Sequence, residues 1–190
     1  MRRALLPLTL LALTLPACDS DDPGDEPDPG DLELITRVEV TLASTVDPED
    51  VVTLIAIDED GDGVGIEYQP VRASLAPGVT YAGTIRLTDE PNDRNVTDEI
   101  ELEADQHRFA YSSTVDGLSI VVTDSESDYL EDQGFEDYEV GLTFDVAVSA
   151  EASGSGTLGV VLYHFDEPKE SSEDTSDEID VELAFPISVE

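Results

Sequence analysis

Hydrophobic and polar residues alternate along most of the chain from Leu32 onward. The alternation is clearest in three segments, which read VTYAGTIRL at 79–87, GLTFDVAVS at 141–149 and IDVELAFPISV at 179–189. Because successive side chains of a β-strand point to opposite sides of the sheet, a period of two predicts half-buried strands. The expected inward faces are Val79, Tyr81, Gly83, Ile85 and Leu87; Leu142, Phe144, Val146 and Val148; and Val181, Leu183, Phe185, Ile187 and Val189.

Shorter runs of the same kind predict further strands. In the strand expected at 156–165, residues 160–163 are apolar on both faces, which favours a central strand covered on both sides. Pro186 falls on the outward set of the last strand and has no N–H to donate, which favours an edge strand. The further strands are expected at 34–42, 51–57, 65–75, 106–112, 118–123 and 156–165.

One segment is ambiguous between helix and strand. The residues NVTDEIELEA at 95–104 place acids near their start, which suits a helix N-terminus, while Val96, Thr97 and Ile100 also allow a strand. We expect a short helix or turn that crosses between sheets.

The number and spacing of these strands predict the fold class. About nine short strands separated by polar turns indicate an all-β domain over residues 32–190, a single antiparallel β-sandwich of immunoglobulin-like type. A closed β-barrel is the alternative. The polar run at 166–180 precedes the last strand and is expected to be a long mobile loop.

The first residues predict export. A basic head, MRR, precedes the apolar run ALLPLTLLALTLPA, which is shorter than the roughly 20 residues of a membrane span and is typical of a secretory signal peptide over residues 1–17. Leu15-Pro16-Ala17-Cys18 resembles the bacterial lipobox, so Cys18 is the predicted lipidation site. The alternative is an ordinary secreted protein with an incidental cysteine. Cys18 is the only cysteine of the chain, so no intramolecular disulfide can form.

Residues 18–31 are expected to be the lipidated cysteine and an acidic, disordered tether. The segment after Cys18 combines acids with proline and glycine and has too few apolar residues to offset the entropy of ordering. Acids after a lipidated cysteine resemble a surface-export signal of some bacteria, whereas in others an aspartate there marks retention at the inner membrane. We favour an outer-membrane lipoprotein that is periplasmic or surface-exposed.

The charge of the chain limits its partners. It has 46 acidic residues against 8 lysines and arginines, for a formal net charge of −38. Such a field repels phosphates, so we expect no nucleic acid partner. The acids could serve to concentrate cations, but the scarcity of lysine favours adaptation to high salt, where repulsion is screened.

The sharpest motif is the run DEDGDG. Asp58, Asp60 and Asp62 stand at alternate positions before Gly63, as in the opening of a calcium loop. The twelfth position is Gln69, where an EF-hand needs a glutamate, so this is no EF-hand. Calcium held by another cage and a plain hairpin turn rich in Asp-Gly are the two interpretations, and the turn is favoured.

A second acidic cluster follows another predicted strand. Asp124 and Glu126, with Asp128, repeat the alternate spacing. If both clusters lie at the same end of the sandwich, Asp124 and Glu126 could help the first cluster to hold one calcium ion. If not, each is a solvated loop.

The two histidines both fall in predicted strands. Neighbouring strands could bring His107 and His164 together as ligands of a transition metal. Hydrogen-bonded structural histidines are the more common outcome. Enzyme signatures are missing, since the sequence contains no G-x-S-x-G, no phosphate loop and no carboxylate pair that stands out, so we expect no enzyme.

Several stretches carry a resemblance: the lipobox, DEDGDG, YAGTIRL, EADQHRFAY, LGVVLYH and IDVELAFPISV. With them, nearly the whole chain resembles small acidic β-rich lipoproteins of Bacteroidota and related halophilic bacteria, a group without an established activity. The resemblance implies an envelope location and a β-rich fold, and it transfers no functional residues.

Together these observations predict a lipid-anchored β-sandwich of the cell envelope. We expect a non-enzymatic binding or accessory module, held to the membrane by its lipid, whose loops meet a partner such as an outer-membrane protein. The alternative is a calcium- or metal-binding envelope lipoprotein that uses the acids named above. A hydrolase built on scattered carboxylates is a third hypothesis.

Overall fold

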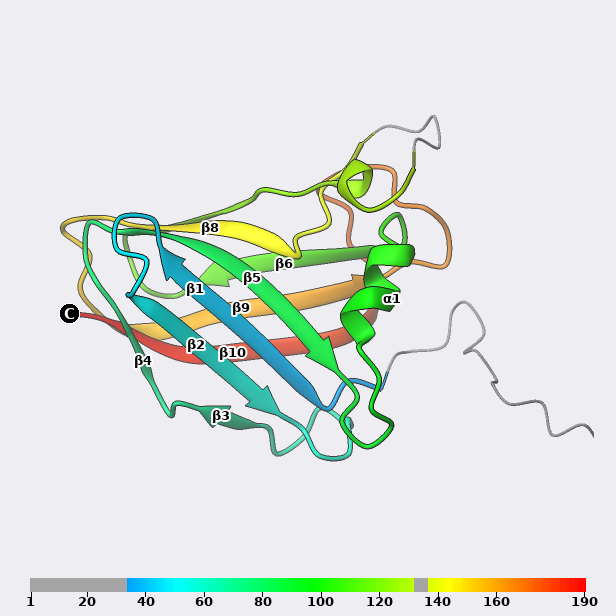
Figure 1. The fold of residues 1–190 in the computed structure, drawn as a ribbon, viewed down its shortest axis with the longest axis horizontal. Helices are drawn as coiled ribbons and strands as arrows, with labels where there is room; N and C mark the ends of the chain where they lie inside the picture. Colours follow the sequence, from blue (N-terminus) through cyan, green and yellow to red (C-terminus); the bar gives the residue numbers. More distant parts are fainter. Residues whose placement is uncertain (1–33, 132–136) are drawn as a thin grey trace, which may run out of the picture.

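The computed structural model describes residues 34–131 and 137–190, which form two β-sheets packed face to face (Figure 1). The predicted signal peptide at 1–17, the lipidation site Cys18 and the tether at 18–31 lie outside the described residues. The six-stranded sheet has the order β3-β2-β1-β5-β8-β7, and the four-stranded sheet has the order β4-β10-β9-β6. The elements are β1 (Arg37–Ser44), β2 (Val51–Ile57), β3 (Glu67–Gln69), β4 (Ala73–Leu75), β5 (Thr80–Thr88), α1 (Val96–Leu102), β6 (His107–Ser113), β7 (Leu118–Val122), η1 (Glu126–Asp128), β8 (Thr143–Val148), β9 (Gly154–His164) and β10 (Glu178–Val189).

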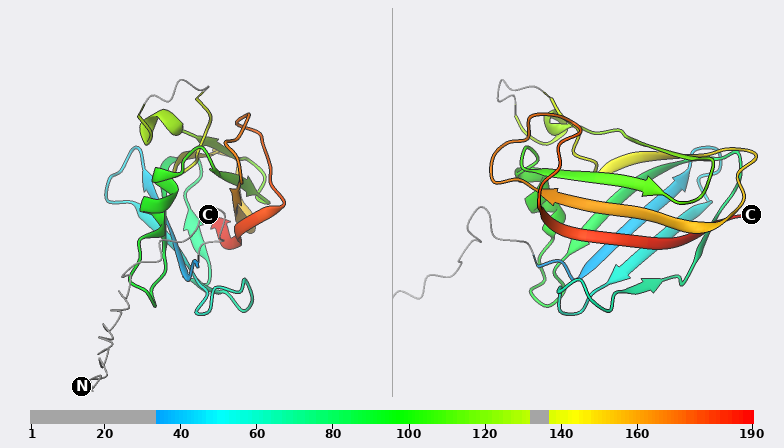
Figure 2. Two further views of the ribbon diagram at one scale, coloured as in Figure 1. Left: turned by 90° about the vertical axis from the view of Figure 1, so that its right-hand side faces the viewer. Right: turned by 180° about the vertical axis from the view of Figure 1, so that it is seen from behind.

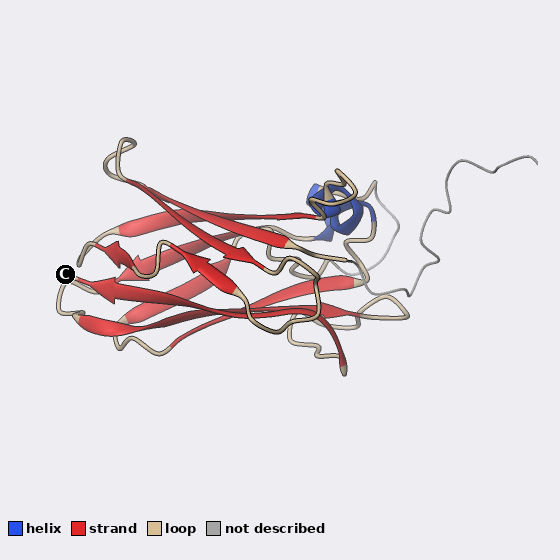
Figure 3. Cartoon of the chain, turned by 90° about the horizontal axis from the view of Figure 1, so that it is seen from below, coloured by secondary structure: helices blue, strands red, loops and turns tan. Residues whose placement is uncertain are grey.

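The alternation in the sequence sets the two faces of each sheet. In β1 and β5, every second side chain is buried, and the ladder pairs Val40 with Ile85 across the strands. The buried faces of the two sheets meet in one core, where the rings of Tyr111 and Phe144 stack with centroids 4.0 Å apart. Figures 2 and 3 show the two layers from behind and from below, with the helices gathered at one end.

This arrangement confirms the all-β prediction and the two-sheet architecture over the closed barrel. Within the described residues, no hydrogen-bonded ladder joins one sheet to the other. One detail differs from the expected all-antiparallel pattern, because β4 pairs with β10 in parallel. The predicted strand at 65–75 is in fact two strands, since β3 belongs to the large sheet and β4 to the small one. Pro70 lies between them and has no N–H to continue a ladder.

The small sheet tests the two expectations about individual strands. β9 is central, as predicted, but only its inward side chains are buried, whereas Val161 and Tyr163 on the outer face are half-buried. β10 is not the edge strand that Pro186 favoured, because it lies between β4 and β9; the pairing with β4 begins only at Ile187, so no strand needs the missing N–H of Pro186. Two residues earlier, the N–H of Ala184 donates to the hydroxyl of Tyr68.

The ambiguous segment is helical. Helix α1 buries Val96 and Ile100, and the hydroxyl of Thr97 accepts a hydrogen bond from the N–H of Leu87 at the end of β5. The predicted helix is therefore confirmed, and its two buried side chains seal one end of the sandwich. Within the described residues, no helix is both long enough and apolar enough to cross a membrane.

The polar segment before β10 is tied down rather than loose. Lys169 donates from its backbone N–H to the carbonyl of Asp105, and the guanidinium of Arg108 donates to the carbonyl of Asp174. These bonds hold the segment against the turn that follows α1 and against the start of β6. The sequence predicted a mobile loop because residues 166–180 are polar throughout, and this composition gives no sign of the hydrogen bonds that hold the segment.

Candidate metal centre

Two buried histidines stand side by side at the helical end of the small sheet. His107 begins β6 and His164 ends β9, and the antiparallel register places them directly opposite each other. Their ring centroids are 4.6 Å apart, and their side chains are at most 1 % exposed. The structure thus brings together the pair that the sequence offered as metal ligands.

A carboxylate joins them from the third strand. Asp180 lies where the register of β10 shifts, because Ile179 pairs with Tyr163 while Val181 already pairs with Leu162. Asp180 is therefore the extra residue of a β-bulge, a device that redirects a side chain. The shift leaves Ile179 40 % exposed and turns the Asp180 side chain, with 0 % exposure, into the interior.

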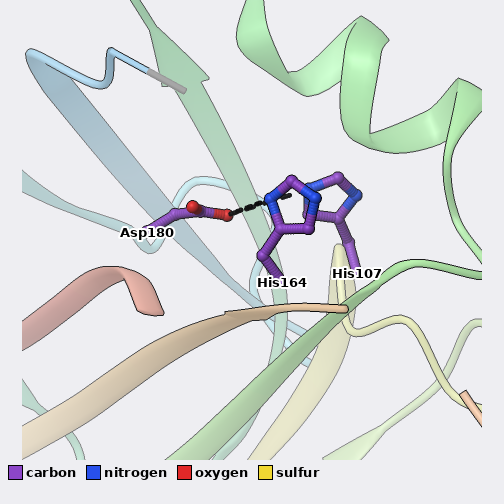
Figure 4. Close-up of side chains that lie close together, drawn as sticks. All are labelled: His107, His164 and Asp180. Atoms are coloured by element: carbon purple, nitrogen blue, oxygen red, sulfur yellow. Dashed lines mark ion pairs between the residues drawn. The ribbon is translucent and has the colours of Figure 1, made fainter. Parts of the chain in front are cut away.

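The three side chains converge on a common point (Figure 4). Oδ2 of Asp180 lies 3.7 Å from Nε2 of His107 and 3.6 Å from Nδ1 of His164. One ligand atom from each of the three residues lies within 4.8 Å of the others. Both distances to Asp180 exceed the 2.7–3.2 Å of a hydrogen bond. They are close to the separation of two ligands around a tetrahedral zinc ion with bonds of 2.0–2.1 Å, which is about 3.4 Å.

The backbone fixes the tautomer of one imidazole. Nδ1 of His107 lies 3.1 Å from the carbonyl oxygen of Glu103, the residue that caps α1. Because a carbonyl only accepts, Nδ1 carries the proton. In neutral His107, Nε2 therefore presents its lone pair toward Asp180, which is the arrangement found in metal-ligating histidines.

The acidic turn forms the connection between β2 and β3. Carboxylate oxygens of Asp58, Asp60 and Asp62 lie within 4.8 Å of one another. Two of the three acids also serve the turn itself, because Asp58 accepts from the N–H of Gly63 at 2.7 Å and Asp62 from the N–H of Val64 at 2.8 Å. The hairpin expected from Asp-Gly is thus present, and calcium binding at this turn stays a prediction.

Asp124, which follows β7, forms hydrogen bonds with the backbone at the start of β8. Its buried carboxylate accepts hydrogen bonds from the N–H groups of Gly141 and Thr143, at 2.8 and 3.1 Å, and from the hydroxyl of Tyr129 at 2.6 Å. Burial, followed by this bond to Asp124, raises the pKa of Tyr129. Asp124 is therefore a buried acceptor that joins the chain after β7 to β8.

The carboxylate of Glu126 forms an ion pair with the side chain of Lys169. Its Oε1 lies 2.7 Å from Nζ of Lys169, whose side chain is 0 % exposed and also donates to the carbonyl of Ala104. Burial lowers the pKa of Lys169, and the Glu126 carboxylate opposes that shift. Glu126 thus compensates a buried ammonium group.

The two acidic clusters do not meet. They follow β2 and β7, which run in the same direction, so both clusters lie at the same end of the sandwich. Four strand spacings of about 4.8 Å separate these strands, or roughly 19 Å. Asp58, Asp60 and Asp62 form a cluster that includes neither Asp124 nor Glu126.

The acidic turn borders the buried centre instead. A cavity of about 50 Å³ between the sheets is lined by Asp58, Gly61 and Gly63 of the turn and by Asp180 of the bulge. A single water needs about 10–15 Å³, so the cavity has room for a few. Oδ1 of Asp58 is covered from solvent and accepts no hydrogen bond from the described residues.

Sequence reasoning found the two histidines and missed Asp180. The alternation places Val181 on the inward face, so Asp180 was assigned to the outward one. No signal in the sequence marks the bulge, because its effect depends on the register against β9.

Comparison with known proteins adds no identification. The chain matches no family model, no curated protein and no solved structure. The interpretation of the centre therefore depends on its own geometry.

Proposed function

We propose that this chain binds a divalent transition-metal ion through His107, His164 and Asp180. The observation that carries the proposal is the position of Asp180 Oδ2, which faces two imidazole nitrogens at almost equal distances, 3.7 Å from Nε2 of His107 and 3.6 Å from Nδ1 of His164. Ligands that share one central ion keep the spacing seen here.

The ligand set selects the class of metal. Two imidazoles and one carboxylate suit zinc and its neighbours in the first transition row, whereas calcium takes six to eight oxygens. Three protein ligands leave a position for water or an additional ligand. We take zinc as the representative ion.

The surroundings favour cations. Asp58 of the acidic turn and Asp180 of the centre line the same cavity. In this arrangement the three acids of the turn raise the concentration of cations beside the cavity that Asp180 lines. The excess of acids over the whole chain works in the same direction, since it raises the local concentration of cations.

We also propose that the domain works at the cell envelope. The signal-like N-terminus and Cys18 support a lipid-anchored, outer-membrane location, and the lack of an enzyme signature supports a non-enzymatic binding or accessory role toward an outer-membrane partner. Its short strands in two packed sheets support an immunoglobulin-like classification of the sandwich.

Zinc binding is tested on the full chain purified in detergent. After removal of metals with a chelator and dialysis against zinc, we expect one ion per chain and a higher melting temperature. An ion present at about 100 times its Kd stabilises the folded state by about 2.7 kcal/mol. Asp180→Asn keeps the shape of the side chain and should lose both effects.

A matched control separates a lost ligand from a lost charge. Glu178→Gln removes one carboxylate from an exposed position of the same strand and should bind zinc as the wild type does. If the wild type takes up no zinc, or if Asp180→Asn binds it equally well, the centre is a structural cluster and the proposal is wrong.

The envelope location has its own test. Cys18→Ser should move the protein from the membrane fraction to the soluble fraction of its cells, because the lipid is the predicted attachment. A variant that sediments with the membranes as the wild type does would contradict lipid anchoring.

A further inference from the structure

A second cavity lies on the outer face of the large sheet. It has a volume of about 490 Å³, which is within the range of about 300–1,000 Å³ for small-molecule sites. Strands β1 and β5 form its floor, and the connection from β5 to α1 forms its wall. Its lining residues are Arg37, Glu39, Arg86, Thr88, Asp89, Glu90, Asp93, Arg94 and Asn95.

Arginines are concentrated there. Three of the 8 basic residues of the chain line this one cavity. Arg94 is held by its neighbours, since its guanidinium contacts both oxygens of Glu99 and lies 3.9 Å from Asp89. Arg37 likewise contacts Glu39 at 3.2 Å and Glu90 at 3.9 Å.

Arg86 and Asp93 are the charges left over. Among the described residues, no carboxylate lies within 4.0 Å of the Arg86 guanidinium, although the register places Arg86 opposite Glu39. The Asp93 carboxylate likewise has neither an ion pair nor a hydrogen bond with any described residue. Three arginines and four carboxylates line the cavity, and among them only Arg86 and Asp93, both with exposed side chains, make no ion pair with a described residue.

Two polar atoms of the lining, one on the floor and one on the wall, have no partner among the described residues. Oγ1 of Thr88 and Oδ1 of Asn95 are covered from solvent and make no hydrogen bond with the described residues. Because both atoms are covered, a ligand in the open cavity meets the exposed side chains of Arg86 and Asp93 first.

Hydrogen bonds within the chain fix the loop that forms the wall. The N–H groups of Asp89 and Arg94 each donate to the other's carbonyl at 3.1 Å, which closes the loop between them. The buried carboxylate of Asp89 accepts from the side-chain amide of Asn92 at 2.7 Å, and the N–H of Glu90 donates to Thr36 Oγ1 at 2.9 Å. The loop that carries Asp93 is therefore fixed before any ligand arrives.

We propose that this cavity binds a small zwitterion of the amino-acid class. Arg86 takes the carboxylate of the ligand, and Asp93 takes its ammonium group. Such a ligand has no net charge, so the field of a chain with a net charge of −38 does not repel it as it repels a simple anion. The cavity lining contains no aromatic side chain, which counts against a stacked sugar or a quaternary ammonium compound.

Equilibrium dialysis of the full chain in detergent against labelled L-glutamine tests the proposal. We expect the labelled glutamine to bind saturably. Compared with unlabelled glutamine, the analogue without the amino group and the analogue without the carboxylate should each displace it about tenfold less well, because each loses one charged hydrogen bond. Arg86→Gln and Asp93→Asn should each weaken binding by about the same factor. Asn suits position 93, where φ is 55°, because it tolerates the left-handed region.

Two control variants make the same changes of charge at positions outside the cavity. Arg72→Gln and Asp116→Asn alter exposed residues outside the cavity and should leave the affinity unchanged. Three results would overturn the proposal: no saturable binding of glutamine, equally good displacement by the analogue without an amino group, or an Arg86→Gln variant that binds as the wild type does.

Discussion

Lys169 Nζ lies 2.7 Å from Glu126 Oε1, and this contact joins the segment before β10 to the turn η1 after β7. The two residues are 43 positions apart in the sequence, by the difference of their numbers, and their pairing closes the helical end of the sandwich. Burial lowers the pKa of Lys169 while the carboxylate opposes the shift, so each charge depends on the other to remain in the interior.

Lys169→Met should destabilise the domain by about 3 kcal/mol, because it leaves the Glu126 carboxylate buried without its cation. The double variant Lys169→Met, Glu126→Leu removes both charges and should return to within about 1 kcal/mol of the wild type. Chemical denaturation at fixed salt measures all three proteins. If the double variant is no more stable than the single one, the pair does not compensate as described.

Gly83→Ala should cost about 2 kcal/mol through overpacking. A Cβ at this position would lie 2.5 Å from Cε2 of Phe144, the residue directly opposite on β8. The cost should shrink in a Phe144→Leu background, where no ring occupies the space. An equal loss in both backgrounds would show that Phe144 is not the obstacle.

The stability contributed by Asp174 should disappear in acid. A hydrogen bond from the N–H of Glu170, followed by one from the Ser171 hydroxyl, lowers the pKa of Asp174 below its ordinary value of 3.8. A lowered pKa in the folded state means that the contribution is complete above pH 3.8 and is lost as the pH falls through the folded-state value. The melting temperature of the wild type should therefore exceed that of Asp174→Asn near neutral pH, and the difference should shrink as the pH falls below 3.8. A difference that stays constant over this range would contradict the assignment.

Salt should stabilise the domain. With a net charge of −38, repulsion among the acids opposes the compact state, and the Debye length shortens from about 30 Å at 0.01 M to about 3 Å at 1 M. Melting temperatures in potassium chloride should rise steadily over that range. Sucrose at matched osmolality is the control, and a melting temperature that ignores ionic strength would refute the halophilic interpretation.

Calcium and zinc should act at separate places. If the acidic turn binds calcium, millimolar calcium raises the melting temperature and Asp60→Asn, an exposed change in that turn, removes the effect. The same variant should leave the response to zinc intact, and Asp180→Asn should do the reverse. A calcium response that survives Asp60→Asn would place the ion elsewhere.

Much of the fold follows from local pattern. Tyr81, Phe144 and Leu183 were assigned inward from alternation, and all three are buried. Alternation succeeds because a strand's two faces are fixed by geometry, whatever its neighbours are. The parallel pairing of β4 with β10 could not be predicted, because it depends on how the chain passes from β3 in one sheet to the three-residue β4 in the other.

The candidate centre was half predictable. His107 and His164 could be suspected because both fall in strands of the expected sheet, yet their exact opposition depends on the register. Asp124 and Glu126 resembled ligands by spacing, but their oxygens are engaged by Gly141, Thr143 and Lys169, which lie far away in the sequence. Spacing describes which side chains are near in the chain and says nothing about competing donors that arrive through the fold.

The bulge at Asp180 has a genetic consequence. Loss of its codon would restore regular pairing between β9 and β10 and leave residues 181–189 in their present register, so the sandwich would survive without the carboxylate. A single in-frame insertion is therefore enough to equip an ordinary strand with a buried ligand. Where His107 and His164 are already present, one mutational event can therefore add or remove the third ligand while the architecture is inherited unchanged.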